Sequence, residues 1–407
     1  MSSAKARLKN YRQLMRFRKP IFNNIDRRLA RAHTIYDLRD IAKKVTPIGP
    51  FDYTDGAADQ EISLNRARRA FENIEFQPRI LRNVESAELG VKLFGKDMMI
   101  PLGIAPTGFT RMMNTDGEIA GAQVAFKYGA PFCLSTMGTT SIEEISKSSP
   151  GGSNWFQLYL WRDRERSLGL IERAEKAGFD GLVLTVDAQV AGARLRDIRN
   201  GLTVPPTLTA KTLLNAAPRT SWWWNFLTKE PLSFASLESW NGTVAELMNT
   251  MFDPTMTFDD LKWIRKVWGR KLIVKGIQNV DDAKQAIKCG ADAVWLSNHG
   301  GRQLDRAPVP FQLISPTRKA LGRSIPIHFD TGIMHGADVI AGLASGGNFA
   351  WIGRAYLYGL MAGGRAGVEK TFEILVSQMT RTMKLLGVNS VSELEPSMVK
   401  TLFEMRP

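Results

Sequence analysis

The chain has 407 residues, 44% of them hydrophobic, and a formal net charge of +14, so it can bury a sizeable core within one α/β domain. No run of about 18 apolar residues is present, so we expect no membrane-spanning helix. Cys133 and Cys289 lie in apolar segments and no signal-peptide core begins the chain, which favours a reducing cytoplasm over a disulfide framework.

Most of the charge belongs to the first 33 residues. They hold ten Lys and Arg against one acidic residue, Asp26, which is a net +9 of the +14. We therefore expect a basic N-terminal arm over residues 1–33. Residues 34–100 read as an N-terminal helical cap, and residues 361–407 as closing helices that end in a C-terminal tail over 391–407.

Short apolar runs rich in β-forming residues alternate with amphipathic helical stretches through the rest of the chain. This alternation predicts parallel βαβ units, and eight runs predict a closed (β/α)8 TIM barrel within a domain over residues 34–390. The runs are 102–107, 131–136, 155–160, 181–187, 272–276, 293–299, 325–331 and 349–354.

The fourth and fifth predicted strands are separated by a long excursion. It covers residues 188–256 and contains three adjacent tryptophans, Trp222, Trp223 and Trp224. The segment Thr257-Phe-Asp-Asp260 has the pattern of a capping box, so we expect a helix to begin there and to lead back to the barrel.

Polar or ionisable side chains follow nearly every predicted strand. One such residue alone is more simply a helix cap or a hydrogen-bonded core residue. In a TIM barrel, however, the C-terminal strand ends meet at one face, where so many charges would cost desolvation unless they had a function. The residues are Thr107, Ser135, Gln157, Tyr159, Thr185, Asp187, Lys275, His299, Arg302, Asp330 and Arg354.

The segment SNHGGRQLD (297–305) indicates which chemistry this face of the barrel could perform. His299 can meet Asp187 across the mouth of the barrel, and a carboxylate beside an imidazole makes it a proton acceptor near neutral pH. Arg302 can clamp a carboxylate with two hydrogen bonds, and Arg194 is a candidate second guanidinium. A base with two arginines indicates a small anionic acid that loses protons.

Eight motifs in order carry a family resemblance over roughly residues 34–390. The chain resembles the FMN-dependent L-2-hydroxy-acid dehydrogenases and oxidases, and within them it is most similar to actinobacterial-type respiratory L-lactate dehydrogenases. The motifs are FDYTDGAADQE (51–61), IAPTGF (104–109), FQLY (156–159), LTVD (184–187), VKG (274–276), SNHGGRQLD (297–305), DTGIMHGADV (330–339) and IGRAYLYG (352–359).

The resemblance implies a role for each candidate residue. His299 would be the base, oriented by Asp187, and the substrate would be held by Tyr53, Tyr159, Arg194 and Arg302. For FMN, the resemblance places Pro106, Thr107 and Gly108 beside the flavin ring and Ser135, Gln157, Thr185 and Lys275 at its polar edge. Gly332, Gly353 and Arg354 would hold the phosphate, and Asp330 and Thr331 would also bind the cofactor. No metal is implied.

Four positions depart from common members of the family, one of them Gly108, which stands where several oxidases have alanine. Met334 stands where many relatives carry a phosphate-binding arginine, so Arg354, backbone amides or the adjacent His335 would have to compensate. Gln189 replaces a common proline on the path toward Arg194. Met137 replaces the tryptophan of glycolate-oxidase-like members and reshapes the acyl side of the pocket.

The expected function is the oxidation of an L-2-hydroxy acid, with L-lactate to pyruvate favoured and quinone or cytochrome as acceptor. No GxGxxG fingerprint follows a predicted strand, which argues against NAD. An O2-using oxidase of the glycolate or lactate type is the alternative enzyme. A catalytically retired barrel with a nucleic-acid-binding arm is the alternative of another class, which the intact His299, Asp187 and arginines disfavour, so no nucleic-acid partner is expected. The sequence leaves hydride and carbanion routes open.

The arm and the tryptophans together suggest an anionic membrane surface as a partner. Tryptophan favours the lipid–water interface, and basic segments are attracted to anionic lipid, so we expect peripheral binding at the cytoplasmic face of the cell membrane. In the alternative, the tryptophans pack over the active-site mouth or a subunit contact and the arm is only solvated. The resemblance also implies a homo-oligomer, commonly a tetramer.

Overall fold

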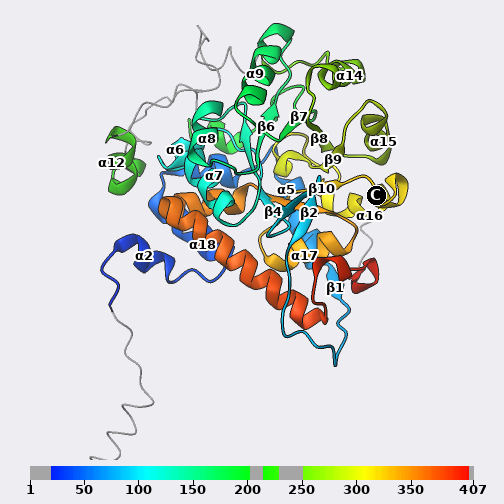
Figure 1. Ribbon diagram of the computed structural model, residues 1–407. Helices are drawn as coiled ribbons and strands as arrows, with labels where there is room; N and C mark the ends of the chain where they lie inside the picture. The colour runs from blue at the N-terminus through cyan, green and yellow to red at the C-terminus, as the bar shows by residue number, and fades with distance from the viewer. Residues whose placement is uncertain (1–19, 202–213, 229–250, 403–407) are drawn as a thin grey trace, which may run out of the picture.

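The computed structural model describes residues 20–201, 214–228 and 251–402. Its centre is a closed barrel of eight parallel strands in the order β10-β11-β4-β5-β6-β7-β8-β9 (Figure 1). The predicted TIM barrel is confirmed, and each predicted run overlaps one of these strands. They are β4 (Leu102–Ile104), β5 (Phe132–Ser135), β6 (Asn154–Leu158), β7 (Gly181–Thr185), β8 (Lys271–Ile277), β9 (Ala293–Leu296), β10 (Ile327–Phe329) and β11 (Phe349–Ile352).

Aromatic side chains fill the inside of the barrel. Trp295 and Trp351 stack with ring centroids 4.4 Å apart, and Trp155 lies 4.9 Å from Trp351. The hairpin of β2 (Val91–Leu93) and β3 (Lys96–Met98) adds Leu93 and Met98 to this cluster. The barrel interior is therefore packed, as is usual for this fold, and a ligand must bind at the rim.

Helices surround the barrel (Figure 1). Thr257 caps α14 with the predicted capping box, which confirms the helix expected at that point. After β11 the chain continues into α18 (Arg354–Leu386), which bends where Gly363 and Gly364 leave helical geometry. The other outer helices are α7 (Gly117–Lys127), α8 (Ile142–Ser148), α9 (Arg164–Lys176), α14 (Phe258–Val267), α15 (Val280–Lys288), α16 (Pro310–Leu321) and α17 (Gly336–Ala344).

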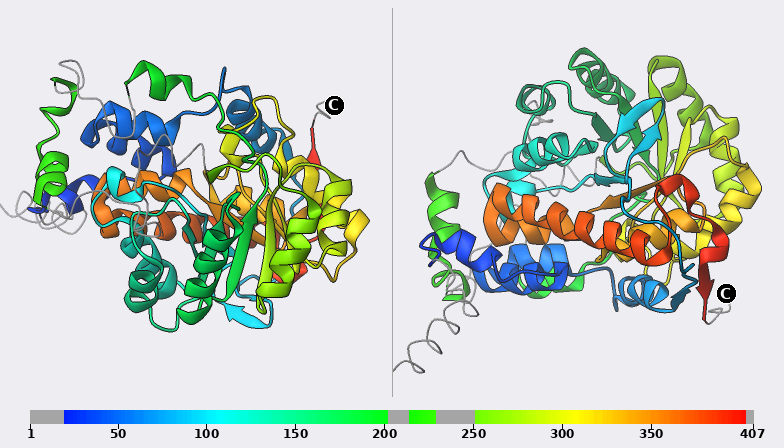
Figure 2. Two further views of the ribbon diagram at one scale, coloured as in Figure 1. Left: turned by 90° about the horizontal axis from the view of Figure 1, so that it is seen from above. Right: turned by 60° about the horizontal axis from the view of Figure 1, so that its bottom comes forward.

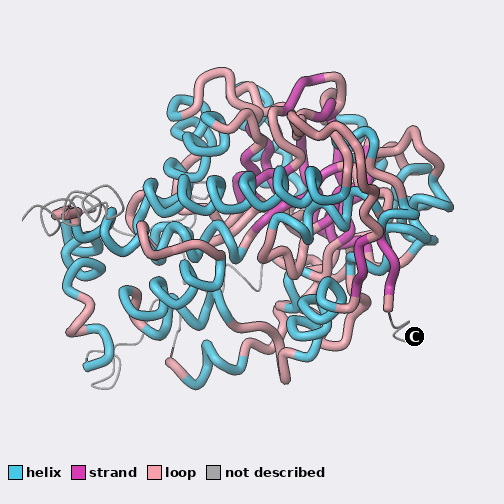
Figure 3. Tube along the Cα trace, turned by 90° about the horizontal axis from the view of Figure 1, so that it is seen from below, coloured by secondary structure: helices cyan, strands magenta, loops and turns pink. Residues whose placement is uncertain are grey.

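The segment before the barrel is only partly helical. It forms α2 (Asn24–Leu29), α3 (Ile35–Val45), α4 (Ile48–Asp55) and α5 (Ile62–Glu72), so the expected helical cap ends at Glu72 instead of reaching residue 100. Strand β1 (Ile74–Phe76) follows and pairs antiparallel with β12 (Val399–Thr401), beside the C-terminus in Figure 3. The segment expected as a C-terminal tail therefore joins the folded body through β12, a long-range pairing that no local pattern signals.

The arm and the excursion are each described in part. Residues 1–19 lie outside the described residues, and within α2 the buried Leu29 belongs to the main core. The excursion contributes α10 (Leu195–Arg199) and α12 (Thr220–Thr228), while 202–213 and 229–250 also fall outside the described part. Figure 2 shows α12 and α2 at the same end of the molecule. Among the described helices, none combines the length and apolarity needed to cross a bilayer.

Candidate active site

A histidine and an aspartate from two strand ends form the centre of the site. His299 begins the turn after β9, and Asp187 follows β7. The Nδ1 atom of His299 lies 3.1 Å from Oδ1 of Asp187, and Nε2 lies 3.4 Å from the hydroxyl of Tyr159. His299 has φ +58°, an uncommon conformation for a residue with a side chain, which is typical of functional sites.

The electrostatic environment keeps this histidine neutral and the aspartate charged. Burial lowers the pKa of His299 below its ordinary value, although the charge of Asp187 acts in the opposite direction. Burial also tends to raise the pKa of Asp187, but His299 and Lys275 outweigh it and the net shift is downward. A carboxylate that accepts Nδ1–H leaves Nε2 unprotonated, so the atom facing the cavity is a proton acceptor.

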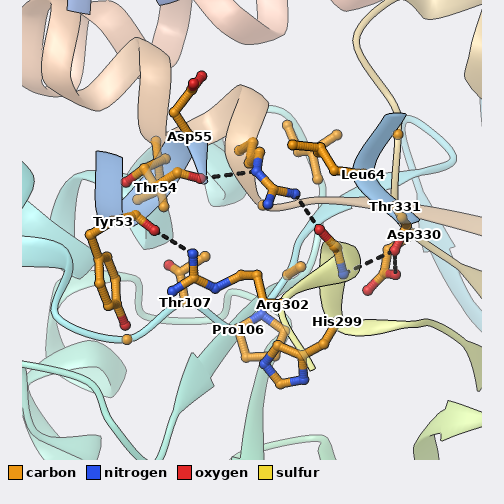
Figure 4. A pocket seen from close by; sticks show the side chains of 18 of the residues that line it. Tyr53, Thr54, Asp55, Leu64, Pro106, Thr107, His299, Arg302, Asp330 and Thr331 are labelled. Atoms are coloured by element: carbon orange, nitrogen blue, oxygen red, sulfur yellow. Dashed lines mark hydrogen bonds between the residues drawn. The ribbon is translucent and has the colours of Figure 1, made fainter. Parts of the chain in front are cut away.

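Two arginines and a tyrosine lie on the other side of the cavity. The guanidinium carbons of Arg302 and Arg194 lie 4.5 and 5.8 Å from the ring centroid of Tyr53. Arg302 donates to the backbone carbonyl of Tyr53 (Figure 4). Neither guanidinium forms an ion pair with a carboxylate of the described residues.

Burial, followed by the charge of Arg194, lowers the pKa of Arg302 to about 10. The charge of Asp197 acts on both arginines without forming an ion pair with either, and the two guanidinium groups repel each other, so an anionic ligand would stabilise this arrangement. The two arginines are therefore chemically suited to a carboxylate, and they lie in the same cavity as His299.

The cavity around these residues has a volume of about 370 Å³, within the usual range for small-molecule sites. Fifteen of the eighteen residues predicted for the site line it. They are Tyr53, Pro106, Thr107, Gly108, Ser135, Tyr159, Arg194, Lys275, His299, Arg302, Asp330, Thr331, Gly332, Gly353 and Arg354. Asp187, Gln157 and Thr185 lie behind this lining. Asp187 contacts His299, Gln157 bonds to Ser135 at 3.1 Å, and Thr185 is buried at the end of β7.

Buried polar atoms without partners among the described residues lie just behind one edge of the cavity. Nε2 of Gln157 and Oγ1 of Thr185 have no hydrogen-bond partner among the described residues. Lys275 is almost fully buried, and its Nζ lies 3.0 Å from Oγ of Ser297 and 3.5 Å from Oδ2 of Asp330. Buried polar groups in native proteins are nearly always satisfied, so this edge fits a ligand rich in carbonyl and amide groups. The pyrimidine edge of a flavin ring is such a ligand.

Sequence reasoning missed a cation at the opposite end of the cavity. Arg68, from α5, donates to the carbonyl of Gly332 at 2.6 Å and forms an ion pair with Asp338 at 2.6 Å. It lines the cavity next to Met334, where the sequence lacks the arginine of many relatives. His335, considered as a substitute, instead caps α17 through Nδ1.

Arg354 is held by the protein backbone. Its guanidinium donates to the carbonyls of Thr54, Gly300 and Gly56 at 2.9, 2.8 and 2.7 Å. It thereby joins α4 to the turn after β9 and leaves its remaining donor capacity at the cavity wall. With Arg68 it gives this end a positive charge suited to a phosphate.

Apolar side chains close the side of the cavity next to Tyr159. Phe109 and Met137 are buried there, and the ring of Phe252 packs edge-on against Tyr159 with centroids 5.5 Å apart. Gly108 is required by this packing, because a Cβ at that position would lie 2.8 Å from the Cβ of Met137. Phe252 belongs to the excursion, and no local sequence pattern indicates its place in the cavity.

Comparison with known proteins identifies the class that this barrel and site define. A model of the family described as FMN-dependent dehydrogenase matches residues 42–401, and the chain belongs to this family. A Mycobacterium tuberculosis protein with the provisional name L-lactate dehydrogenase is 53% identical over 401 residues, covering 98% of this chain and 97% of that protein.

Two further similarities extend this finding. An L-lactate dehydrogenase of Vibrio cholerae is 37% identical over 372 residues, covering 89% of this chain and 98% of that protein. The crystal structure of the monotopic membrane protein (S)-mandelate dehydrogenase matches with a TM-score of 0.88 and 34% identity, covering 91% of this chain and 100% of that one. Membership of the family makes FMN the cofactor, in agreement with the unpartnered polar edge and the cationic end of the cavity.

Proposed function

We propose that this protein oxidises L-lactate to pyruvate and that His299 is the catalytic base. The observation that carries the proposal is the arrangement of His299, held by Asp187 at 3.1 Å, opposite Arg302 and Arg194 within one cavity. The two relatives named as L-lactate dehydrogenases support lactate as the substrate.

In this proposal, some residues of the site bind the substrate and others transfer its proton. Arg302 and Arg194 hold the substrate carboxylate, since guanidinium groups bind carboxylates with paired charge-assisted hydrogen bonds. The hydroxyl of Tyr159 lies within 3.4 Å of Nε2 of His299, so it positions the substrate oxygen next to the base. Nε2 then takes a proton from the substrate, and Asp187 stabilises the resulting imidazolium.

The residues at the cofactor edge orient FMN, which supplies an acceptor for two electrons when bound. Gln157 and Thr185 offer hydrogen bonds to the ring edge, and the ammonium of Lys275 favours negative charge there. Arg68 and Arg354 hold the phosphate end. Phe109, Met137 and Phe252 exclude water from the reacting face and leave room for a short side chain on the substrate.

A substrate panel tests this proposal. We expect the purified protein to be yellow, and anaerobic L-lactate to bleach the flavin absorbance while D-lactate leaves it unchanged. His299→Gln should keep its FMN and remain yellow with L-lactate, because glutamine approximates the shape of imidazole but is not a base. A variant that bleaches as fast as the wild type would assign the base to another residue. A yellow protein that no 2-hydroxy acid bleaches would favour the catalytically retired barrel.

We infer that the electrons pass to a quinone or cytochrome at the cytoplasmic face of the membrane, where the protein binds peripherally. Trp224 and Leu227 of α12 are 72% and 73% exposed, whereas Trp222 donates to the carbonyl of Met112 at 3.0 Å. Trp222 therefore anchors α12 on α6 (Thr110–Met113), and Trp224 is available to lipid. Reoxidation of the lactate-reduced enzyme should be fast with a quinone analogue and slow with O2. Faster reoxidation by O2 than by the quinone analogue would identify the protein as an oxidase.

We also propose a homo-oligomer, with a tetramer expected from the family resemblance. Ile80, Leu81 and Leu385 are 82%, 98% and 72% exposed, and the amide of Arg79 bonds to the carbonyl of Leu386, which brings these segments together. Exposed apolar surface of this kind suits a subunit contact. Light scattering of the purified protein gives the mass, and a monomer would contradict the proposal.

A further inference from the structure

A second cavity lies away from the active site, between α2, α6, α12 and α18. Its volume is about 30 Å³. A single water needs about 10–15 Å³ on this measure, so the space suits two or three waters or one small oxyanion, but not a sugar or a nucleotide base. Its polar lining consists of Arg28, Thr46, Arg111, Asn114, Thr115, Ser221 and Asn225, and none of its described lining residues is acidic.

Within the described part of the chain, Arg28 lines this cavity without a carboxylate partner. Its side chain is half-buried in the last turn of α2, and it forms no ion pair with any acidic residue in the described ranges. Its Nε atom is buried without an acceptor there, and burial lowers the pKa of the group. Removing a guanidinium from water without a counter-ion costs free energy, so a bound anion would stabilise Arg28 at this position.

Thr46 provides an independent sign of a missing partner. It is 1% exposed at the end of α3, and its Oγ1 has no hydrogen-bond partner among the described residues. A buried hydroxyl is normally satisfied. Valine would fill the same volume without this cost, so a threonine at this position is explained by an acceptor that enters the cavity.

The groups around the cavity are chemically complementary to an anion. The guanidinium of Arg28, the hydroxyl of Thr46 and the carboxamide of Asn225 can donate, and none of the described lining residues is acidic. A phosphate group offers several acceptor oxygens and negative charge, and it is matched by arginine in particular.

The cavity also lies at the end of the molecule where apolar side chains are exposed. Phe22, just before α2, is 86% exposed, and Trp224 and Leu227 of α12 are similarly accessible. Figure 2 shows α2 and α12 together at this end. A surface with tryptophan and phenylalanine next to cations is suited to the headgroup region of an anionic membrane.

We propose that this cavity binds a phosphate group, with Arg28 as the counter-charge and the Thr46 hydroxyl as a hydrogen-bond donor. The site is separate from lactate oxidation. It rests on the proposed membrane association only for the source of the phosphate, which is either a lipid headgroup or a dissolved phosphate.

Calorimetric titration of the FMN-loaded full chain with inorganic phosphate, against chloride at equal ionic strength, tests the site itself. Arg28→Gln should weaken phosphate binding by about tenfold, and Thr46→Val by roughly fivefold, as expected for a charge-assisted and a neutral hydrogen bond. Arg27→Gln is the matched control, because it removes the same charge from the residue just before Arg28 in α2. The side chain of Arg27 bonds to Asn24 and does not line the cavity. This substitution should change the affinity by less than roughly twofold.

Sedimentation with vesicles of phosphatidylcholine, with and without phosphatidylglycerol, distinguishes the two sources. If the phosphate belongs to a lipid, Arg28→Gln should lose binding to the anionic vesicles far more than Arg27→Gln does. If it is a dissolved phosphate, the two variants should sediment alike while the calorimetric difference remains. Flavin absorbance and dye-linked lactate oxidation should be unchanged in every variant, which confirms folding.

The proposal is overturned if Arg28→Gln and Arg27→Gln behave alike in both assays, or if Thr46→Val binds as tightly as the wild type in both. A wild type that ignores vesicles but binds phosphate through Arg28 would refute the membrane association and leave the phosphate site standing.

Discussion

At the residue scale, catalysis depends on the pKa of His299. The reaction needs the neutral imidazole, and burial lowers its pKa below the ordinary value of about 6.5. Activity should therefore be constant at neutral pH and fall only on acidification below that value, as the base becomes protonated. Because the charge of Asp187 raises the pKa of His299, loss of that charge should lower the pKa further.

Asp187→Asn tests this coupling. We expect the acid limb of the kcat/KM profile to move to lower pH and the plateau to fall by at least about 100-fold, because the imidazole is a weaker base and its tautomer is no longer fixed. The pH profiles of wild type and variant measure both effects. An acid limb that stays in place or moves to higher pH would show that Asp187 does not act through His299.

Substitution of Arg302 tests its proposed role in substrate binding. Arg302→Lys should raise KM and lower kcat together, at a cost of about 2–4 kcal/mol in transition-state binding, because an ammonium cannot reproduce the planar grip of a guanidinium. Steady-state kinetics with L-lactate measure the loss. Arg306→Lys is the control, since Arg306 is exposed and bonds to Gln60. If both variants have the same kinetics, Arg194 and not Arg302 would be the residue that binds the substrate carboxylate.

At the element scale, the excursion after β7 shapes the substrate pocket. It supplies Phe252, whose ring packs edge-on against Tyr159 and closes the apolar side of the cavity. It also supplies Arg194 and the anchored helix α12. One insertion therefore contributes to substrate specificity, to binding of the substrate carboxylate and to the outer surface. A loop of this length in a compact domain usually has such functions.

Phe252→Ala should widen the range of substrates. Removing the ring opens space beside the substrate side chain, so the ratio of kcat/KM for (S)-mandelate to that for L-lactate should rise by about tenfold or more. Phe258→Ala, at the exposed start of α14, is the control of the same residue type. A ratio that changes equally in the two variants would place the size limit elsewhere, at Met137 or Phe109.

At the scale of the whole molecule, positive charge and exposed aromatic side chains occur at one end. The described part of the arm includes α2, which packs on α18 through Leu29, so deletion of residues 1–31 would also remove a packed helix. Deletion of residues 1–19 is the cleaner experiment. These residues carry seven Lys and Arg and no acidic residue.

We expect this deletion to release the protein from anionic vesicles and leave lactate oxidation with a soluble dye intact. Each basic residue near an anionic surface contributes about 1 kcal/mol at most, and salt screens it. Sedimentation at low and high salt, with wild type and truncated protein in parallel, measures the effect. A wild type that stays in the supernatant at low salt would refute the peripheral association.

The amino-acid sequence alone determined the barrel and much of its chemistry. The eight apolar runs are local patterns, and parallel strands place their C-terminal ends at one face, so the proximity of His299, Asp187 and Lys275 could be predicted without coordinates. The capping box at Thr257 was equally local. The roles assigned to these residues stay predictions until the variants are measured.

Only the tertiary structure decided the features that depend on contacts between distant segments. Arg68 reaches Gly332 across 264 positions, Phe252 meets Tyr159 from the end of the excursion, and β12 returns to pair with β1. Nε of Arg28 and Oγ1 of Thr46 belong to the same class, since their lack of a partner among the described residues depends on contacts between distant segments. Periodicity and capping describe interactions within a few residues along the chain. Long-range packing determines which side chains share a cavity, and no local pattern encodes it.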